Sequence, residues 1–201
     1  MEKLVDLHCD TIWKLMDAGE EMTFFCVNID EMKQADTMAQ FFACFVDVGS
    51  FPEKERYENG YAYVKKMMER MRKEVENFSQ EIVFARNGEE IEKNRKAGKI
   101  SALLTVEEGG VLNGKIERVE ELWSMGIRLI TILWNYENCI GYPNSERSEI
   151  MRKGLKQFGF EVVEKMNERK MLVDVSHLSD GGFWDVVKTS KCPVVASHSN
   201  A

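Results

Sequence analysis

Residues 171–180 read MLVDVSHLSD, an apolar run that gives way to polar residues around a histidine. Two other stretches repeat this pattern, LVDLHCD at 4–10 and PVVASHSN at 193–200. Short runs that are apolar on both faces are typical of strands buried in a parallel sheet. Such runs occur at 4–7, 41–48, 101–106, 127–133, 171–175 and 193–197. They predict the strands of the fold, and the polar residues after them mark the strand ends.

Stretches with helical periodicity lie between these runs, at 58–77, 88–96, 116–124, 156–169 and 180–188. One face of the first carries the apolar residues Tyr61, Val64, Met67 and Met68. The last begins beside a good N-cap residue, Ser179 or Asp180. Strands that alternate with helices predict a parallel α/β fold, because right-handed crossovers connect parallel strands.

Ligand-type side chains at the strand ends favour a (β/α)8 barrel over a doubly wound sheet. A doubly wound sheet usually has a glycine-rich phosphate loop after its first strand, whereas this first strand ends in His8, Cys9 and Asp10. A closed barrel has eight strands and typically about 250 residues. We therefore predict one domain over 1–201, a TIM-type barrel that is C-terminally incomplete, with about six βα units present.

Composition narrows the class of protein. The 27 Lys+Arg and 34 Asp+Glu give a net charge of -7, so neither nucleic acid nor an anionic membrane is an expected partner. The start MEKLVDLHCD lacks the basic segment and apolar stretch of a secretory signal, and the sequence contains no run of about 20 apolar residues of the kind that spans a bilayer. We expect a soluble cytoplasmic protein. The odd number of cysteines and the absence of C-x-x-C spacing predict free thiols at Cys9, Cys26, Cys44, Cys139 and Cys192. The less favoured alternative is that Cys9 is a nucleophile or ligand.

The chain has three histidines, His8, His177 and His198, and each follows an apolar run. The strand ends of a parallel barrel face one common space, and imidazole is the commonest nitrogen ligand of zinc. His8 and Asp10 form an H-x-D pair, in which side chains two residues apart on an extended segment point the same way. Taken one at a time, each histidine is more readily explained as an ordinary core or loop residue, whereas the three together favour metal binding.

The stretch LLTVEEGG at 103–110 offers a carboxylate, Glu107 or Glu108. A charged side chain at the mouth of a barrel strand is costly to desolvate unless it is paired or metal-bound. The alternative is that both glutamates are solvated turn residues. Three histidines, an aspartate and a glutamate exceed what one tetrahedral catalytic zinc takes. Two metals about 3.5–4 Å apart could share them, hold a hydroxide and polarise a carbonyl, which predicts hydrolysis of an amide or ester.

Four motifs together resemble the membrane (renal) dipeptidases, peptidase family M19: H-x-D, V-E-x-G-G, DVSHLSD-x-GFWDV and P-V-x-ASHSNA. The resemblance covers nearly the whole chain. It implies a (β/α)8 barrel with two zinc ions that hydrolyses dipeptides, in some members those with a C-terminal D-residue. It also implies the ligand positions. His8 and Asp10 would bind one metal, Glu107 would bridge both, and His177 and His198 would bind the second, with Asp10 and Glu107 as the catalytic carboxylates.

Glu107 matches the bridging position because the stretch from there to Gly126 then aligns without a gap. Glu108 takes the place of the family's glycine and is the runner-up. Trp134 stands where some members have a substrate-contacting histidine, so their substrate preference does not transfer. Trp134, Asn135 and Tyr136 are candidates for lining the substrate pocket, with plain packing as an equal alternative. Asp174 is a candidate support for the ligands.

The family's later arginine and aspartate, near the substrate and the attacking water, lie beyond Ala201. We therefore expect this chain alone to be weakly active or inactive, and a non-catalytic metal-binding fragment is the first alternative. The second is another binuclear amidohydrolase, a class that usually begins with H-x-H and often carries a bridging lysine. The preferred dipeptide, the native metal and the oligomeric state, including a homodimer, are left open.

Overall fold

The computed structural model describes residues 3–18 and 27–199. The chain forms two compact units. The first consists of Met1–Phe45 and Val64–Thr105, and the second of Val46–Tyr63 and Val106–Ala201. Helix α3 (Arg56–Asn77) and strand β4 (Ile100–Glu107) each contribute residues to both units. The single domain expected from the sequence stays a prediction.

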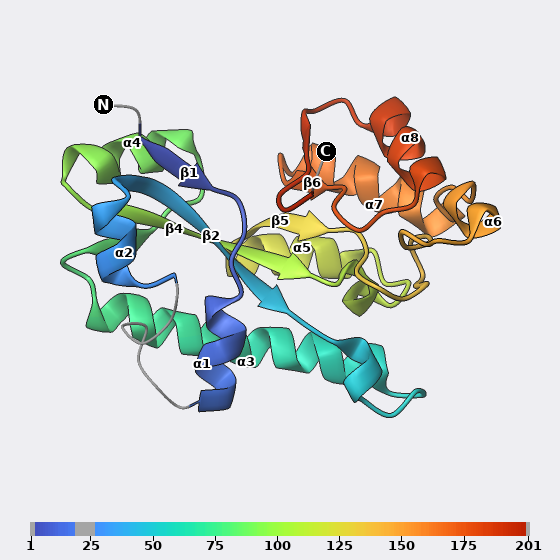
Figure 1. Ribbon diagram of the computed structural model, residues 1–201, viewed down its shortest axis with the longest axis horizontal. Coiled ribbons are helices and arrows are strands. Elements are labelled where there is room, and N and C mark those ends of the chain that lie inside the picture. The colour runs from blue at the N-terminus through green and yellow to red at the C-terminus, as the bar shows by residue number, and fades with distance from the viewer. Residues whose placement is uncertain (1–2, 19–26, 200–201) are drawn as a thin grey trace. The chain divides into compact units, whose positions relative to one another are not determined.

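The first unit is built on a parallel sheet (Figure 1). Its strands are β1 (Leu4–Asp6), β2 (Thr37–Phe45), β3 (Ile82–Phe84) and β4 up to Thr105. Its helices are α1 (Thr11–Ala18), α2 (Ile29–Gln34), α4 (Gly88–Lys96) and α3 from Val64 onward. Strand β1 pairs with β2 from Leu4 opposite Thr37 to Asp6 opposite Gln40, and β3 pairs with β4. The order in this unit is β1-β2-β4, with β3 also beside β4.

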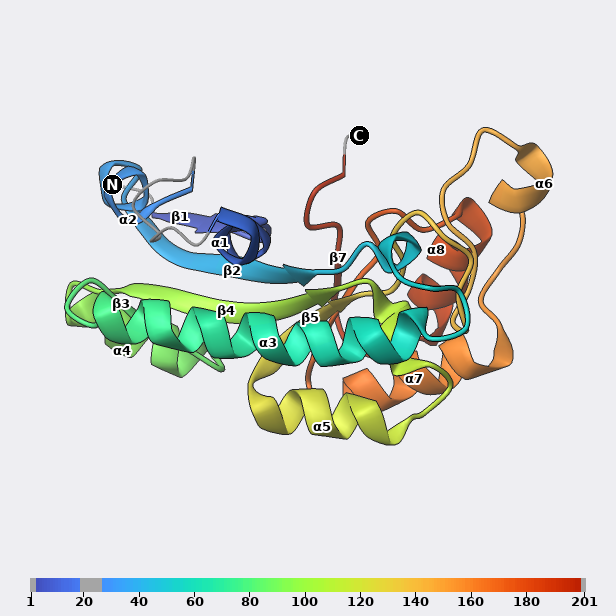
Figure 2. The same ribbon diagram turned by 90° about the horizontal axis from the view of Figure 1, so that it is seen from below.

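The second unit also combines parallel strands with helices (Figure 2). Its three complete strands are β5 (Ile127–Thr131), β6 (Leu172–Asp174) and β7 (Val194–Val195). Its complete helices are α5 (Glu117–Met125), α6 (Ser148–Met151), α7 (Gln157–Glu168) and α8 (Asp180–Thr189), with short 3-10 turns at η2 (Val48–Ser50) and η3 (Gly109–Leu112). Asp174 lies in register with Thr131 on one side and Val195 on the other, so the ends of all three strands meet at this residue.

Every predicted run contains a strand, and the predicted helices are present as α3, α4, α5, α7 and α8. Ser179 is the N-cap of α8, because its Oγ accepts a hydrogen bond from the Gly182 N–H at 3.2 Å. Strand β3 and helices α1, α2 and α6 are additional. They span 3, 8, 6 and 4 residues, too few for periodicity to indicate them.

The expectation that every strand is apolar because it is buried is wrong for β1. Leu4 and Val5 are 45% and 42% exposed. Among the strands within residues 3–18 and 27–199, β1 stands at one end of the pairing order and has a single neighbour, β2. By contrast, the predicted apolar face of α3 (Tyr61, Val64, Met67 and Met68) is buried. No helix of the described chain combines enough length and apolar character to cross a bilayer.

Gly181 in the first turn of α8 marks a close approach of backbone segments. A Cβ there would lie 2.5 Å from the carbonyl oxygen of Lys153 and 2.6 Å from that of Arg152. We expect Gly181→Ala to lower the free energy of unfolding by ~1–3 kcal/mol, because backbone must shift to admit the methyl group. Gly88 is the matched control at the start of α4, where a Cβ meets nothing within 4 Å. Gly88→Ala should change stability by less than ~0.5 kcal/mol in urea denaturation. Equal effects of the two substitutions would contradict this reading.

Glu58 on α3 forms an ion-pair cluster that should make stability pH-dependent. Its carboxylate accepts hydrogen bonds from Lys115 and Asn113, each at 2.8 Å, and pairs with the buried guanidinium of Arg118. The Lys115 hydrogen bond is the main cause that lowers the pKa of Glu58 from 4.5 to about 2. A carboxyl whose pKa is depressed on folding stabilises the fold above its unfolded pKa, and this contribution disappears as the pH falls towards the folded pKa.

Because Glu58 is half exposed, we expect Glu58→Gln to cost only ~0.5–1 kcal/mol at pH 7. The difference from the unchanged protein should shrink steadily between pH 4.5 and pH 2, the two pKa values given above. Urea unfolding of both proteins at pH 7 and at the acidic end of this range measures it. A difference that is independent of pH would show that packing, and not charge, holds this cluster together.

Candidate metal centre

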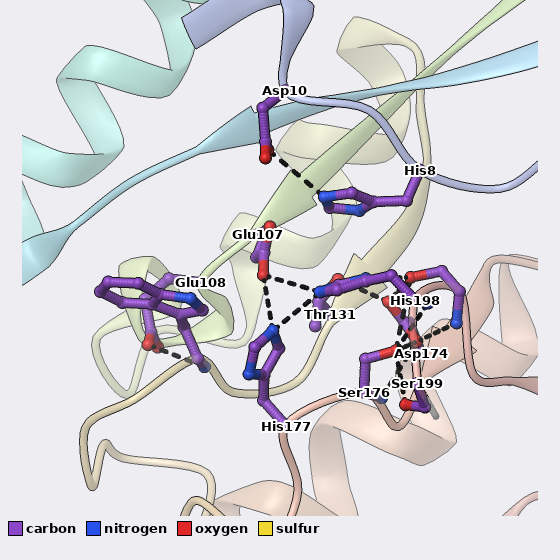
Figure 3. Close-up of polar contacts among 12 residues, drawn as sticks. His8, Asp10, Glu107, Glu108, Thr131, Asp174, Ser176, His177, His198 and Ser199 are labelled. Atoms are coloured by element: carbon purple, nitrogen blue, oxygen red, sulfur yellow. Dashed lines mark hydrogen bonds and ion pairs between the residues drawn. The ribbon is translucent and has the colours of Figure 1, made fainter. Parts of the chain in front are cut away.

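Glu107, His177 and His198 point their side chains toward one another in the second unit (Figure 3). Glu107 Oε1 lies 3.3 Å from the Nε2 atom of each histidine, and the two Nε2 atoms are 2.7 Å apart. Glu107 is buried, whereas the two imidazoles are 28% and 27% exposed. The three donor atoms therefore share a small space that is open on the histidine side.

These donors suit a zinc ion in type and in spacing. Ligands that sit 2.0–2.1 Å from a tetrahedral zinc are roughly 3.3 Å from one another. Both carboxylate-to-imidazole distances have this value, and the two imidazoles need only a slight separation to reach it. A buried carboxylate against two imidazoles is also a combination that zinc binds well. The residues present in the second unit fit a metal.

His177 has a left-handed backbone conformation, with φ of 64°. This region is unfavourable for a residue with a Cβ, and strain of this kind often accompanies function. The preceding segment holds the backbone there: Asn144 N–H donates to the His177 carbonyl at 2.7 Å, and Ser179 N–H donates to the Tyr142 carbonyl at 3.1 Å. The turn after β6 is thus fixed in the conformation that carries the His177 imidazole to Glu107.

His198 is oriented by a serine and an aspartate behind it. Ser197 Oγ lies 2.7 Å from His198 Nδ1 and 2.6 Å from Asp174 Oδ2. Because the carboxylate can only accept, the hydroxyl donates to Asp174, and its oxygen then accepts from the Nδ1–H of His198. This arrangement leaves the lone pair of His198 on Nε2, the atom that faces Glu107 and His177. The chain therefore selects the tautomer that a metal ligand requires.

Asp174 is a fully buried carboxylate at the end of β6 (Figure 3). It accepts five hydrogen bonds, from Thr131 Oγ1, Ser176 N–H, Ser176 Oγ, Ser197 N–H and Ser197 Oγ. A buried charge is tolerated only when it is fully hydrogen-bonded, and Asp174 meets that condition with donors from three successive strand ends. The sequence identified Asp174 as a support, but it did not identify its donors. Serines and a threonine at the ends of apolar runs were the available signal.

Glu108 points away from the histidines, so the geometry separates the two glutamates. Its carboxylate accepts hydrogen bonds from Gly110 N–H, Asn138 Nδ2 and, at 3.2 Å, Trp134 N–H. Burial raises the pKa of Glu108 to about 7. Glu107, the carboxylate that the family resemblance favours, is the one that meets His177 and His198. Neighbouring residues on extended backbone point to opposite sides, which accounts for the division.

His8 and Asp10 belong to the first unit and follow β1. His8 Nε2 and Asp10 Oδ1 are 3.3 Å apart, as expected of side chains two residues apart on extended backbone. Cys9 between them fixes this conformation, because its N–H donates to the Phe41 carbonyl and its carbonyl accepts from Ala43 N–H. The pair is therefore attached to the edge of β2.

Cys9 is poorly suited to nucleophilic chemistry. Burial raises the pKa of the Cys9 thiol to about 12, which disfavours the reactive thiolate and with it the alternative that Cys9 is a nucleophile. Cys9, Cys44, Cys139 and Cys192 are free thiols, as predicted. Cys26 lies outside the described residues.

The candidate substrate residues follow β5. The rings of Trp134 and Tyr136 meet edge to face with centroids 5.8 Å apart, and Asn135 between them is exposed. Burial is the main cause that raises the pKa of Tyr136. The Asp47 carboxylate, which accepts a hydrogen bond from the tyrosine hydroxyl, raises it further. Whether the three residues line a substrate pocket stays a prediction.

Parallel strands whose ends carry histidine and carboxylate side chains are typical of metal-dependent α/β hydrolases. The whole chain, residues 1–201, matches the family described as membrane dipeptidase (peptidase family M19). The chain therefore belongs to the M19 membrane dipeptidase family. The resemblance found in the sequence motifs is confirmed by this match.

Two solved structures share the fold. A dipeptidase described as an M19 metallopeptidase has a TM-score of 0.83 and 22% sequence identity, and the match covers 98% of this chain and 63% of that one. A metallopeptidase from Rhodobacter sphaeroides, liganded with a phosphinate mimic of the dipeptide L-Ala-D-Ala, also has a TM-score of 0.83, with 20% identity over 98% of this chain and 65% of that one. The predicted TIM-type α/β class is confirmed by these likenesses.

The curated relatives include an uncharacterized dipeptidase of Schizosaccharomyces pombe. It is 28% identical over 178 residues, which are 85% of this chain and 42% of the yeast protein. The chain thus spans less than half the length of this relative.

Proposed function

We propose that the protein hydrolyses dipeptides at a centre of two zinc ions held by His8, Asp10, Glu107, His177 and His198. The observation that carries the proposal is the convergence of Glu107, His177 and His198 within 3.3 Å of one another. Bound zinc would supply an activated water and polarise the scissile carbonyl. In this assignment the H-x-D pair would hold one ion, Glu107 would contribute to both, and the two later histidines would hold the second.

The residues of the chain prepare these ligands. Glu107 provides a negative charge in a buried place, where it offsets the charge of the cations at short range. Ser197 and Asp174 keep His198 in the tautomer with a free Nε2. The hydrogen-bonded turn at His177 holds the backbone in one conformation, so the imidazole is already placed near Glu107. Ligands fixed in this way before binding lose little conformational freedom when the metal arrives.

The substrate class is proposed from the family and from a solved relative. The Rhodobacter sphaeroides metallopeptidase is liganded with a phosphinate mimic of the dipeptide L-Ala-D-Ala. We assign the same class of substrate to this protein, with Trp134, Asn135 and Tyr136 beside it. The cytoplasmic location and the homodimer stay predictions.

Metal analysis combined with a substrate panel tests the function. The purified full-length protein is stripped with a chelator, reloaded with zinc and assayed on L-Ala-L-Ala, L-Ala-D-Ala, N-acetyl-L-alanine and a phosphotriester. We expect two zinc ions per chain and zinc-dependent hydrolysis of the dipeptides alone. Turnover of the acetylated amino acid or the phosphotriester would identify a different amidohydrolase. Stoichiometric zinc without turnover of any substrate would identify a non-catalytic metal-binding protein.

A further inference from the structure

Glu108 is a buried carboxylate that the proposed chemistry does not use. It directly follows Glu107, and its backbone is extended, with φ of -175° and ψ of 112°. Glu107 and Glu108 therefore face opposite sides of the same strand end. One side chain reaches the histidines, and the other reaches the segment that follows β5. The position of one is thus tied to the position of the other.

The two oxygens of Glu108 contact different parts of the second unit. Oε1 accepts from the Gly110 N–H in the turn after β4 and from Asn138 Nδ2. Oε2 accepts from the Trp134 N–H at 3.2 Å. The carboxylate therefore links the turn after β4 to both ends of the segment 134–138. That segment carries the two aromatic rings that meet at 5.8 Å.

Asn138 extends this link. Its Oδ1 accepts from Ile140 N–H at 2.7 Å and from Gly141 N–H at 3.2 Å, and its Nδ2 also reaches the Ile132 carbonyl at 3.2 Å. The turn at Gly110 is closely packed as well, because a Cβ on this glycine would lie only 2.6 Å from the Tyr57 ring. The Asn138 end of the segment is thus anchored by packing and hydrogen bonds, and Glu108 anchors the Trp134 end through the Trp134 N–H.

Stability alone is a weak reason for such a residue. A buried carboxylate is expensive to desolvate, and apolar residues of similar volume often replace buried charges without loss. What a carboxylate adds is directional: it accepts from three N–H donors at once and fixes their relative places. An apolar side chain could fill the same volume, but it could not hold the Trp134 backbone at a set distance from the strand that carries Glu107.

We propose that Glu108 is a positioning residue that sets the place of Trp134 beside the dipeptide and so tunes the fit of the substrate side chain. This inference rests on the proposed dipeptidase function. Glu108 acts through the backbone of Trp134, without contact to the metal ions or the peptide bond. Its removal should therefore weaken substrate binding while the metal centre remains intact.

Glu108→Gln is the sharpest variant, because it changes one side of the link. The amide oxygen of the glutamine can still accept hydrogen bonds from Gly110 and Asn138. Its Nε2 group then faces the Trp134 N–H, and because both groups are donors, that hydrogen bond is lost. We expect KM for L-Ala-L-Ala to rise about three- to tenfold, the equivalent of one hydrogen bond, with kcat changed less than about threefold. The zinc content should stay at its original value.

Two further measurements keep the result interpretable. In a Trp134→Ala background, Glu108→Gln should leave KM nearly unchanged, because the side chain it positions is gone. Acrylamide quenching of tryptophan fluorescence gives a readout without turnover: Glu108→Gln should increase quenching in the otherwise unchanged protein but not in a Trp134→Phe background. Glu161→Gln, on the exposed side of α7, is the matched control for loss of a carboxylate.

The outcomes separate the two proposals. If no dipeptide is hydrolysed by the unaltered protein, the proposed function fails, and the quenching comparison still tests the positioning role. Unchanged quenching together with unchanged KM in Glu108→Gln overturns the positioning role. Loss of zinc in Glu108→Gln overturns it as well, because Glu108 would then act on the metal ligands themselves.

Discussion

Alanine in place of His177 is expected to remove the second of the two proposed zinc ions and, with it, dipeptide hydrolysis. The imidazole provides one of three donor atoms that meet within 3.3 Å, and neither the carboxylate nor His198 can reach the lost position. Loss of a supporting group around a metal typically costs ~10–100-fold in affinity, and loss of a direct ligand should cost more. Zinc affinity, measured by competition with a chromophoric chelator, should fall by more than ~100-fold, and turnover at limiting zinc should fall with it.

Glycine at the same position makes this prediction sharper. His177 has a φ of 64°, a conformation that glycine adopts freely and alanine does not. The metal-free His177→Gly protein should therefore be more stable than the metal-free His177→Ala protein by ~1 kcal/mol, although both variants lose the second zinc ion. Lys170 is the control, because it is exposed and has a φ of 54°. Lys170→Gly should gain stability and keep zinc. Retained zinc and turnover in His177→Ala would refute the assignment of this ligand.

Asp174→Ala is expected to be the most destabilising of the substitutions considered. It leaves five hydrogen-bond donors without their common acceptor, and three of them, on Thr131 and Ser176, are fully buried. Breaking a buried hydrogen-bonded charge site typically costs ~3–5 kcal/mol, and we expect a loss of this size in the free energy of unfolding. Urea denaturation of the metal-free protein measures it directly, without a contribution from zinc binding.

Ser197→Ala separates the orienting role of this network from its structural role. It removes the hydroxyl that lies between Asp174 and the His198 imidazole, while the Thr131 and Ser176 donors of Asp174 remain. We expect a loss of about 1 kcal/mol in stability but a ~10–100-fold loss in zinc affinity, because His198 is no longer held in the required tautomer. Thr131→Val removes a different donor of Asp174 and should affect stability alone. If Thr131→Val and Ser197→Ala weaken zinc binding equally, tautomer selection is not the role of Ser197.

The main parts of the fold could be predicted from the sequence because they depend on local patterns. The apolar runs and the long amphipathic face of α3 are direct consequences of burial, and the structure contains the corresponding strands and helices. The three histidines were recognisable because each stands at the end of such a run. His177 and His198 do come together, since their strands β6 and β7 are neighbours in parallel register.

Other parts of the site could not be read from the sequence. The strand-end pattern by itself left Glu107 and Glu108 open, and only the family resemblance favoured Glu107, because backbone geometry decides which side each glutamate faces. The left-handed conformation of His177 is held by the Asn144 N–H, which donates to the His177 carbonyl, and by the Tyr142 carbonyl, which accepts from the Ser179 N–H. Tyr142 and Asn144 lie far earlier in the chain, so no local pattern signals this pairing. The donors of Asp174 come from three strand ends, and their convergence depends on strand register.

The alternation of Glu107 and Glu108 has a consequence for how strand β4 can vary. Substitutions between Ile100 and Thr105 change the packing, but they do not change which face of the strand each later side chain points to. Deletion or insertion of a single residue there would reverse every following side chain, turning Glu108 towards the imidazoles and Glu107 towards Trp134. The residue types in this strand can therefore vary, whereas the number of its residues is constrained by the positions of Glu107 and Glu108 at its end.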